Sequence, residues 1–356
     1  MDPASLIPTP DTIPVHWAWF QVLLSATFFL HILVMNVMLG SSIIAVVQHL
    51  NKGDGPLELG REIGSKLTYA IAFTVNLGVA PLLFLQVLYG HFIYSSSVLM
   101  GWFWLTIIPL LICGYYLAYI YSIRYDRIVF SRTLLIGAVS VILLTIGFLM
   151  TNNMTLMQIP ETWNRHLVNP TGFLLNLNDP ELLPRYLHFV LSAIAVGGLA
   201  IALYYEYRRR RGDEDAGRYV QFGCRWFGFA TIANFPVGLL FLDALPDHVH
   251  DVSTPIGTLF SVVLAVSILI GIFAVIMALT ENVMPAMYGA LGAVFGMTVV
   301  RDLSRAGYIG RYFSPGDLQL VPQYSPMFVF LAVFVAGLLL IGWMVKIAMQ
   351  DKEVDE

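Results

Sequence analysis

Two histidines stand inside long apolar stretches of the sequence, where an imidazole costs free energy unless it is hydrogen-bonded or coordinates a metal. His31 lies in the middle of "TFFLHILVMNVMLG", and His188 lies in "RYLHFVLSAIAVGG", three residues after Arg185. Ionisable residues inside membrane segments usually have a function, and histidine is a common protein ligand of haem iron. We therefore interpret His188 and His31 as candidate haem ligands. The alternative is that each imidazole only hydrogen-bonds across helices.

A haem held without covalent bonds needs axial ligands and cationic partners for its propionates. Arg185, beside His188, has the position expected of a propionate partner. Methionine is the other soft axial ligand, and candidates are Met35, Met38, Met154 and Met157. The sequence has no CxxCH, which excludes covalently attached c-type haem. Zinc is a poorer explanation, because the apolar segments contain neither HxxxH nor HExxH.

The composition indicates a membrane protein. Only 12% of the 356 residues are charged and 58% are hydrophobic, whereas soluble proteins carry about 25% charged residues. The sequence predicts an all-α, polytopic transmembrane helical bundle of about nine helices, surrounded by lipid. The net charge of −4 gives no indication of a nucleic-acid partner. The helices are expected near residues 15–48, 67–94, 98–122, 133–156, 185–207, 220–243, 255–280, 283–304 and 326–349.

The positive charges of the short loops predict how the helices are oriented. The first, third and fifth loops carry most of these charges, including Arg124 and the run Arg208 to Arg211, and are therefore expected in the cytoplasm. This places the N-terminus outside and the C-terminus in the cytoplasm. Arg301, Arg305 and Arg311 then fall outside, against the rule. Either the eighth segment does not cross the membrane, or these arginines have an anionic partner on that side, which we favour.

The order and spacing of several motifs resemble subunit I of the cytochrome bd quinol oxidases. "TFFLHILVMNVMLG" is similar to the first helix of that family, in which the histidine ligates a haem. "NNMTLMQIP" is similar to the family's Asn-x-Trp-Met-Gln-x-Pro, with Met157 and Gln158 matching. "RYLHFVLSAIAVGG" resembles the fifth helix, in which the histidine (here His188) binds a low-spin haem b. The resemblance implies one or two haem b groups, a quinone, and a bacterial or archaeal cytoplasmic membrane.

The sequence also departs from that family. The third predicted helix lacks the family's glutamates, the eighth lacks its glutamate ligand, and the seventh lacks the methionine that completes the low-spin haem site. The external quinol-binding loop is replaced by the short connector "DALPDHVHDVSTP". His91 or His16, expected at a similar depth to His188, would then be its second axial ligand. Because "RDLSRAGYIGR" stands where the family has an arginine motif, Arg301 and Arg305 are expected to contact haem propionates or a partner protein.

These expectations divide the chain into four parts. Residues 1–14 form an outward N-terminal segment, and residues 15–245 form the haem-binding bundle that carries the resemblance. Residues 246–349 contain the C-terminal transmembrane helices with an outward arginine-rich loop at 301–325. Residues 350–356 form a cytoplasmic tail.

Three functions are compatible with these patterns. The first is a membrane b-type cytochrome subunit of an oxidoreductase, which passes electrons between the quinone pool and an extracytoplasmic cytochrome or other redox protein. Since the chain has no soluble redox domain, this function needs further membrane subunits. The second is a bd-type terminal quinol oxidase that reduces oxygen, which the missing carboxylates disfavour. The third is a haem-free scaffold or transporter subunit, in which the histidines only pack.

Overall fold

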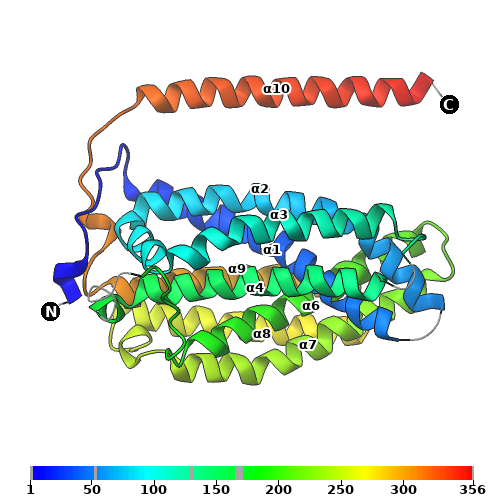
Figure 1. Ribbon diagram of the computed structural model, residues 1–356, viewed down its shortest axis with the longest axis horizontal. Coiled ribbons are helices and arrows are strands. Elements are labelled where there is room, and N and C mark those ends of the chain that lie inside the picture. Colours follow the sequence, from blue (N-terminus) through cyan, green and yellow to red (C-terminus); the bar gives the residue numbers. More distant parts are fainter. Residues whose placement is uncertain (1–2, 52–53, 129–130, 165–170, 355–356) are drawn as a thin grey trace.

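The computed structural model describes residues 3–51, 54–128, 131–164 and 171–354. Across these residues the protein is an all-α bundle, and nine helices are long and apolar enough to cross a membrane (Figure 1). The predicted fold class is therefore confirmed. The helices are α1 (Trp17–Leu50), α2 (Asp54–Leu99), α3 (Gly101–Ile123), α4 (Arg132–Gln158), α6 (Leu182–Arg210), α7 (Ala216–Ala244), α8 (Pro255–Leu279), α9 (Val283–Ile309) and α10 (Ser325–Val354).

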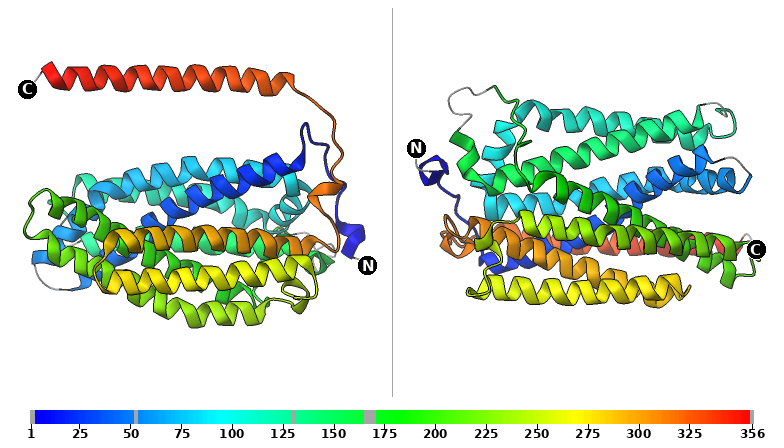
Figure 2. Two further views of the ribbon diagram at one scale, coloured as in Figure 1. Left: turned by 180° about the vertical axis from the view of Figure 1, so that it is seen from behind. Right: turned by 90° about the horizontal axis from the view of Figure 1, so that it is seen from below.

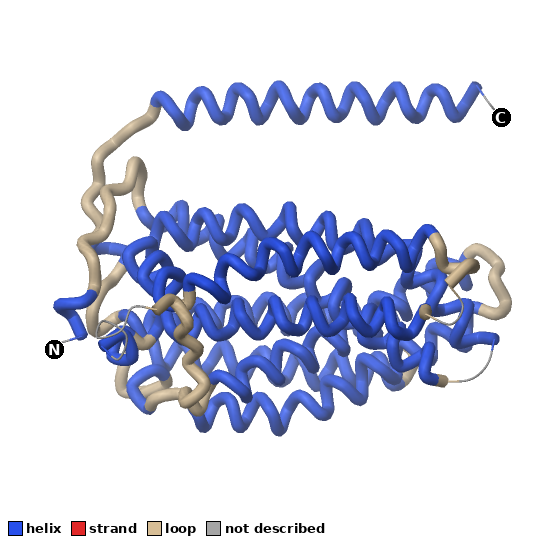
Figure 3. The backbone as a smooth tube through the Cα atoms, in the orientation of Figure 1, coloured by secondary structure: helices blue, strands red, loops and turns tan. Residues whose placement is uncertain are grey.

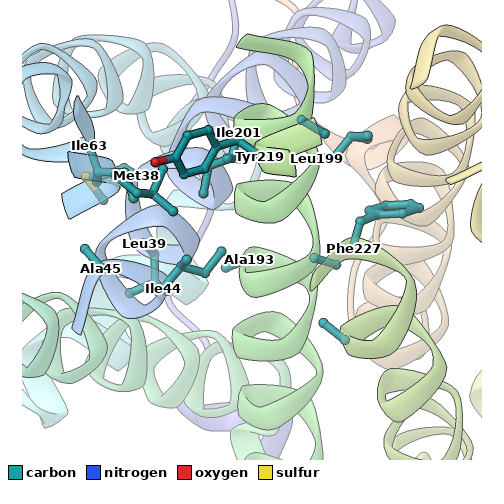
Figure 4. Packing of buried hydrophobic residues seen from close by; sticks show 14 of the residues in the cluster. Met38, Leu39, Ile44, Ala45, Ile63, Ala193, Leu199, Ile201, Tyr219 and Phe227 are labelled. Atoms are coloured by element: carbon teal, nitrogen blue, oxygen red, sulfur yellow. The ribbon is translucent and has the colours of Figure 1, made fainter. Parts of the chain in front are cut away.

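The α1 helix is central to the bundle, because it packs against α2, α4, α6 and α9. Glycines allow it to approach α6 closely. A Cβ atom added to Gly40 would lie 1.8 Å from the backbone oxygen of Ala193, and one added to Gly197 would lie 2.6 Å from the backbone of Gly40. Small residues of this kind let membrane helices pack backbone to backbone. Around this contact, side chains of α1, α2, α6 and α7 pack together as part of a large apolar cluster to which further helices also contribute (Figure 4).

Consecutive helices run in opposite directions, so the connections gather at two ends of the bundle (Figure 3). We call the "N-terminal end" the end that holds residues 3–16, the α2–α3 turn, the α4–α6 and α7–α8 connections and the α9–α10 linker. The "opposite end" holds the remaining connections. Arg301, Arg305 and Arg311 lie at the N-terminal end, whereas Arg124 and the run Arg208 to Arg211 lie at the opposite end.

The structure corrects the boundary of the predicted arginine-rich loop. The expected helix ended at residue 304 and the expected loop began at 301, but α9 continues to Ile309, so Arg301 and Arg305 are helical and face the bundle. Hydropathy alone ends the helix early because these residues are charged. The helix continues because both arginines pair with Asp302, which reduces the cost of placing their charges among packed helices.

The last helix stands apart from the bundle. α10 runs alongside it without close packing in the described residues, and its span Ser325–Met344 has no buried residue (Figure 2). The linker before α10 is fixed to the N-terminal segment. The Ile13 N–H donates to the Gln319 carbonyl at 2.9 Å, and the Val321 N–H donates to the Ile13 carbonyl at 2.9 Å, which makes a parallel bridge between Ile13 and Leu320.

Candidate functional site

His188 lies on α6, about two turns from the N-terminal end of that helix, and faces α7. Its Nδ1 atom is buried and makes no hydrogen bond of good geometry among the described residues, although the Asn234 side chain lies close enough to interact with the ring. Gly238 of α7 lies opposite the ring, where an added Cβ would be 3.4 Å from Nδ1. The neighbouring Asn234 donates to the Ser192 hydroxyl at 2.9 Å, and its own carbonyl oxygen is also buried without a partner. Buried polar atoms are normally satisfied, so this arrangement favours a ligand at His188.

A buried charged network lies one turn from His188 towards the N-terminal end. Arg185 forms an ion pair with Glu181, and both side chains are almost inaccessible to solvent. Arg185 also donates to the Gln158 Oε1 atom at 2.9 Å, which brings together two residues that the sequence singled out. The Tyr308 hydroxyl of α9 donates to Glu181, and so the network joins α4, α6 and α9. An arginine held in this way is oriented before any ligand arrives.

The loop before α6 supports this network. Asp179 accepts hydrogen bonds from the Asn176 side chain at 3.0 Å and from the Glu181 N–H at 3.0 Å. Burial raises the pKa of the Asp179 carboxyl above its ordinary value, and the charge of Arg185 acts in the opposite direction. The start of α6 is therefore fixed by a carboxyl group that is partly withdrawn from water.

His31 lies near the middle of α1 and is half-buried against α2. Its Nδ1 atom is 3.1 Å from the Thr74 carbonyl oxygen. If Nδ1 carries the proton, this contact leaves Nε2 with its lone pair available, which is the usual arrangement of metal-ligating histidines. Gly78 makes room for the ring, because an added Cβ would lie 2.9 Å from its Cε1 atom. The surroundings of His31 are therefore compatible with either a ligand or a simple interhelical hydrogen bond.

Each of these two histidines is linked to a poorly accessible arginine through a phenylalanine ring. Phe241 lies 6.0 Å from the His188 ring and 5.3 Å from the Arg185 guanidinium. Phe28 lies 6.4 Å from the His31 ring, and the Arg301 guanidinium is 3.7 Å from its centroid. In both cases the arginine lies towards the N-terminal end. In each set the candidate propionate partner therefore lies nearer the N-terminal end of the bundle than the candidate iron ligand.

Arg301 and Arg305 are held by Asp302 at the N-terminal end. Asp302 receives hydrogen bonds from Arg301 at 3.2 Å, from Arg305 at 3.1 Å and from the Ser25 hydroxyl of α1 at 2.5 Å. Only 1% of the Arg305 side chain is exposed. The sequence left open whether these arginines contact a partner protein. Arg305 has little surface for a partner protein, because its guanidinium faces Tyr89 inside the bundle.

The other candidate ligands lie in different surroundings. His16 caps the start of α1, where its Nδ1 accepts from the Ala18 N–H at 3.3 Å at an exposed position. His91 lies on α2, with its ring 4.4 Å from that of Phe313. Met157 is fully buried in the apolar cluster at the N-terminal end. The structure thus brings Arg185 and Gln158 together beside His188. His16 and His91, the candidate second axial ligands, have other neighbours than those of His188.

Sequence reasoning missed three residues of these networks: Glu181, Tyr308 and Asp302. Two of them carry a local signal, because Glu181 precedes Arg185 by four residues and Asp302 precedes Arg305 by three, the spacings of ion pairs on one helical face. Tyr308 has no such signal, since it reaches Glu181 from a helix far along the chain.

The donor set fits haem better than a free metal ion. No group of three or more His, Cys, Asp or Glu side chains that could hold a metal occurs among the described residues. A haem needs less from the protein, namely one or two axial ligands and partners for its propionates. His188, whose Nδ1 makes no hydrogen bond of good geometry, and the nearby Arg185 meet these needs.

Comparison with known proteins supports the fold. No family model and no curated protein match this sequence. Among solved structures, a chain in the structure of bd oxidase from Geobacillus thermodenitrificans is similar to it, with a TM-score of 0.70 and 14% sequence identity, over 96% of this chain and 96% of that one. At this identity the likeness shows the fold, and the predicted resemblance is confirmed at that level. It also extends through the helices after residue 245, where the motifs are faint.

Proposed function

We propose that the protein is a membrane b-type cytochrome subunit that passes electrons between the quinone pool and an extracytoplasmic electron carrier, as part of a multi-subunit oxidoreductase. The observation that carries this proposal is the buried imidazole of His188, whose Nδ1 makes no hydrogen bond of good geometry, next to the oriented Arg185. The likeness to a chain of bd oxidase supports it, because that fold occurs in a protein described as an oxidase. The N-terminal end would face outward, as the loop charges predict.

The residues around His188 have distinct roles in this proposal. His188 would hold the iron, and Arg185 would bind a propionate while Gln158 and Glu181 keep it oriented. A bound haem b supplies reversible one-electron transfer. The packed helices exclude water from the site, which strengthens the charge–charge interactions there.

His31 would hold a second haem b, with Arg301 as the corresponding propionate partner. A second haem held by His31 and Arg301 is also compatible with a terminal oxidase. However, α3 carries no Asp or Glu in its sequence, and MYGALGAVFGMTVV in α9 carries none either. An oxygen-reducing site needs protons delivered through the membrane, and carboxylates are the usual carriers. Electron transfer is therefore the function that the side chains support better.

The test is a dithionite-reduced minus oxidised spectrum of the purified protein, recorded with and without carbon monoxide. We expect a low-spin b signal that carbon monoxide does not change, and loss of that signal in His188→Ala. The matched control is His16→Ala, which removes an exposed helix cap and should leave haem content unchanged.

Other results would select the other functions. A large carbon monoxide shift would support the oxidase. Protein that binds no haem would support the scaffold or transporter, and unchanged haem in His188→Ala would remove the assignment of that ligand.

A further inference from the structure

A cavity of about 190 Å³ opens at the N-terminal end, between residues 8–11 of the N-terminal segment and the last turns of α2. It is separate from the surroundings of His188 and His31 described above. Its polar and aromatic wall is formed by Thr9, Asp11, Gln86, His91, Tyr94 and Ser95. The α2 backbone departs from helical geometry at Tyr89, with φ −131° and ψ 29°, between Val87 and Gly90, which both line the cavity.

His91 is the most unusual residue of this wall. It is 8% exposed, and its Nε2 atom is buried without a hydrogen-bond partner among the described residues. One side of the ring packs against Phe313 and Phe92, with ring centroids 4.4 Å and 4.5 Å away. A buried imidazole nitrogen without a hydrogen bond costs free energy, which a ligand with hydrogen-bonding groups would recover.

The charge of the cavity selects the kind of ligand. The described residues that line it include the carboxylate of Asp11 but neither lysine nor arginine. An anionic head group, such as a phosphate, would therefore be repelled. A neutral group with hydroxyl donors fits, because the Asp11 carboxylate and a neutral imidazole of His91 can both accept hydrogen bonds.

The surface around the cavity indicates where the ligand comes from. Val87 and Tyr94 belong to the cavity wall and are also exposed on α2, in line with exposed Leu83 and Val98. This apolar strip on a membrane-spanning helix is expected to face lipid. A ligand that enters along it needs an apolar tail as well as a neutral, hydroxylated head group.

We propose that this cavity binds the head group of a quinol that enters from the membrane, with His91 and Asp11 accepting hydrogen bonds from its hydroxyl groups. The inference rests on the proposed function, and it names the place and the residues at which that function meets its quinone partner. Because Asp11 repels carbonyl oxygens but accepts from hydroxyls, the cavity binds the quinol more tightly than the corresponding quinone.

The test is anaerobic calorimetric titration of the purified full-length protein in detergent with decylubiquinol, menadiol and their oxidised forms. At least one quinol is expected to bind more tightly than its quinone. His91→Leu should raise the Kd for that quinol at least tenfold, and Asp11→Asn should reduce the preference over the quinone. Thr9→Trp, at an exposed position on the cavity rim, should block binding without disturbing the core.

A second cavity provides the matched control. It lies at the same end of the bundle, is lined mainly by apolar residues such as Trp102 and Leu105, and includes exposed Thr171. Thr171→Trp should leave quinol binding unchanged.

The proposal is overturned if neither quinol binds, if Thr9→Trp binds as the unmodified protein does, or if only Thr171→Trp loses binding. Haem content is measured for each variant. Absence of haem with quinol binding retained would contradict the proposed function alone, and haem with no effect of Thr9→Trp would contradict the cavity alone.

Discussion

The two ends of the bundle carry similar charges in opposite surroundings. At the N-terminal end, Arg305 and Glu181 are each 1% exposed and belong to ion pairs inside the packed helices. At the opposite end, the Arg61–Asp126 pair is 64% and 66% exposed. The Arg210 side chain there is also exposed, although its partner Glu206 is not. The ion pairs of Arg305 and Glu181 thus hold their charges away from water, whereas the pairs at the opposite end include strongly exposed side chains; at the N-terminal end the Arg311–Glu161 pair, 46% and 34% exposed, is an exception.

This difference supports the proposal that the haem sites lie towards the N-terminal end. Exposed ion pairs contribute little to stability, whereas a buried charge is tolerated only when its partners are in place. Arg185, near His188, belongs to the buried group, and Arg301, near His31, is 21% exposed and pairs with Asp302. The exposed arginines of the opposite end fit the general role of orienting a protein in a membrane.

The largest expected difference between the ends concerns the loss of an acidic residue. Asp302→Ala leaves Arg301 and Arg305 without their carboxylate and should lower the free energy of unfolding by about 3–5 kcal/mol. Asp126→Ala is the matched change at the opposite end and should cost about 0–1 kcal/mol. Unfolding in mixed micelles by SDS titration measures both. Equal costs would show that the charges at the N-terminal end are hydrated after all.

A pair of tyrosines tests the same comparison with a smaller change. Tyr308→Phe removes the donor to buried Glu181 and should cost about 1–3 kcal/mol, because the carboxylate oxygen loses its partner away from water. Tyr219→Phe removes a donor at 2.8 Å to the half-exposed Glu58 at the opposite end, where water replaces the hydroxyl. The Tyr219 ring is buried but the Glu58 carboxylate stays hydrated, so the cost should be about 0.5–1 kcal/mol, the lower part of the range for a hydrogen bond. The same SDS titration applies, and a larger loss for Tyr219→Phe would contradict the comparison.

The pH dependence of stability separates buried from exposed carboxyls within the N-terminal end. Burial raises the pKa of Asp179 in the folded protein, so its ionisation opposes folding. The resulting loss of stability begins as the pH rises through about 3.8, the ordinary pKa of an aspartate, and is complete above the raised pKa. Asp179→Asn should therefore remove a loss of stability on going from acidic to neutral pH, as measured by thermal unfolding across that range.

Asp251 provides the opposite case. Its carboxyl is exposed and accepts a hydrogen bond from the Ser253 N–H at 2.9 Å, which lowers its pKa. Its contribution to stability is present above its ordinary pKa and is lost as the pH falls. Asp251→Asn should accordingly change the pH profile in the direction opposite to Asp179→Asn. Profiles that move in the same direction would show that burial does not control these two groups.

The smallest expected effect is that of salt on an ion pair at the opposite end. Lys66 and Glu62 form an exposed pair four residues apart on α2, at 2.5 Å. A double-mutant cycle for this pair should give a coupling of about 0.3–0.5 kcal/mol that disappears in about 1 M salt. The corresponding cycle for Arg305 and Asp302 should keep most of its coupling. A salt-insensitive Lys66–Glu62 coupling would contradict the assignment of that end to water.

The sequence was sufficient to predict the fold and to single out individual polar residues in the membrane helices. It was not sufficient to predict which residues they contact. Runs of apolar residues predicted nine helices, and an isolated imidazole in such a run drew attention to His188 and His31. The extension of α9 to Ile309 was missed because hydropathy treats a charged residue as the end of a helix, whatever it pairs with. The contact between Tyr308 and Glu181 could not be predicted, since it depends on how α6 and α9 are placed relative to each other.

The bridge between Ile13 and Leu320 has a consequence for biosynthesis. A membrane protein emerges from the ribosome in order, from its first residues to its last. The N-terminal segment therefore waits, without its final partner, until all the helices up to α9 and the linker that follows have been made. The same segment forms one wall of the cavity at His91. That cavity is thus completed only after the linker has been made, so a partly made chain lacks the full wall of the site to which we assign quinol binding.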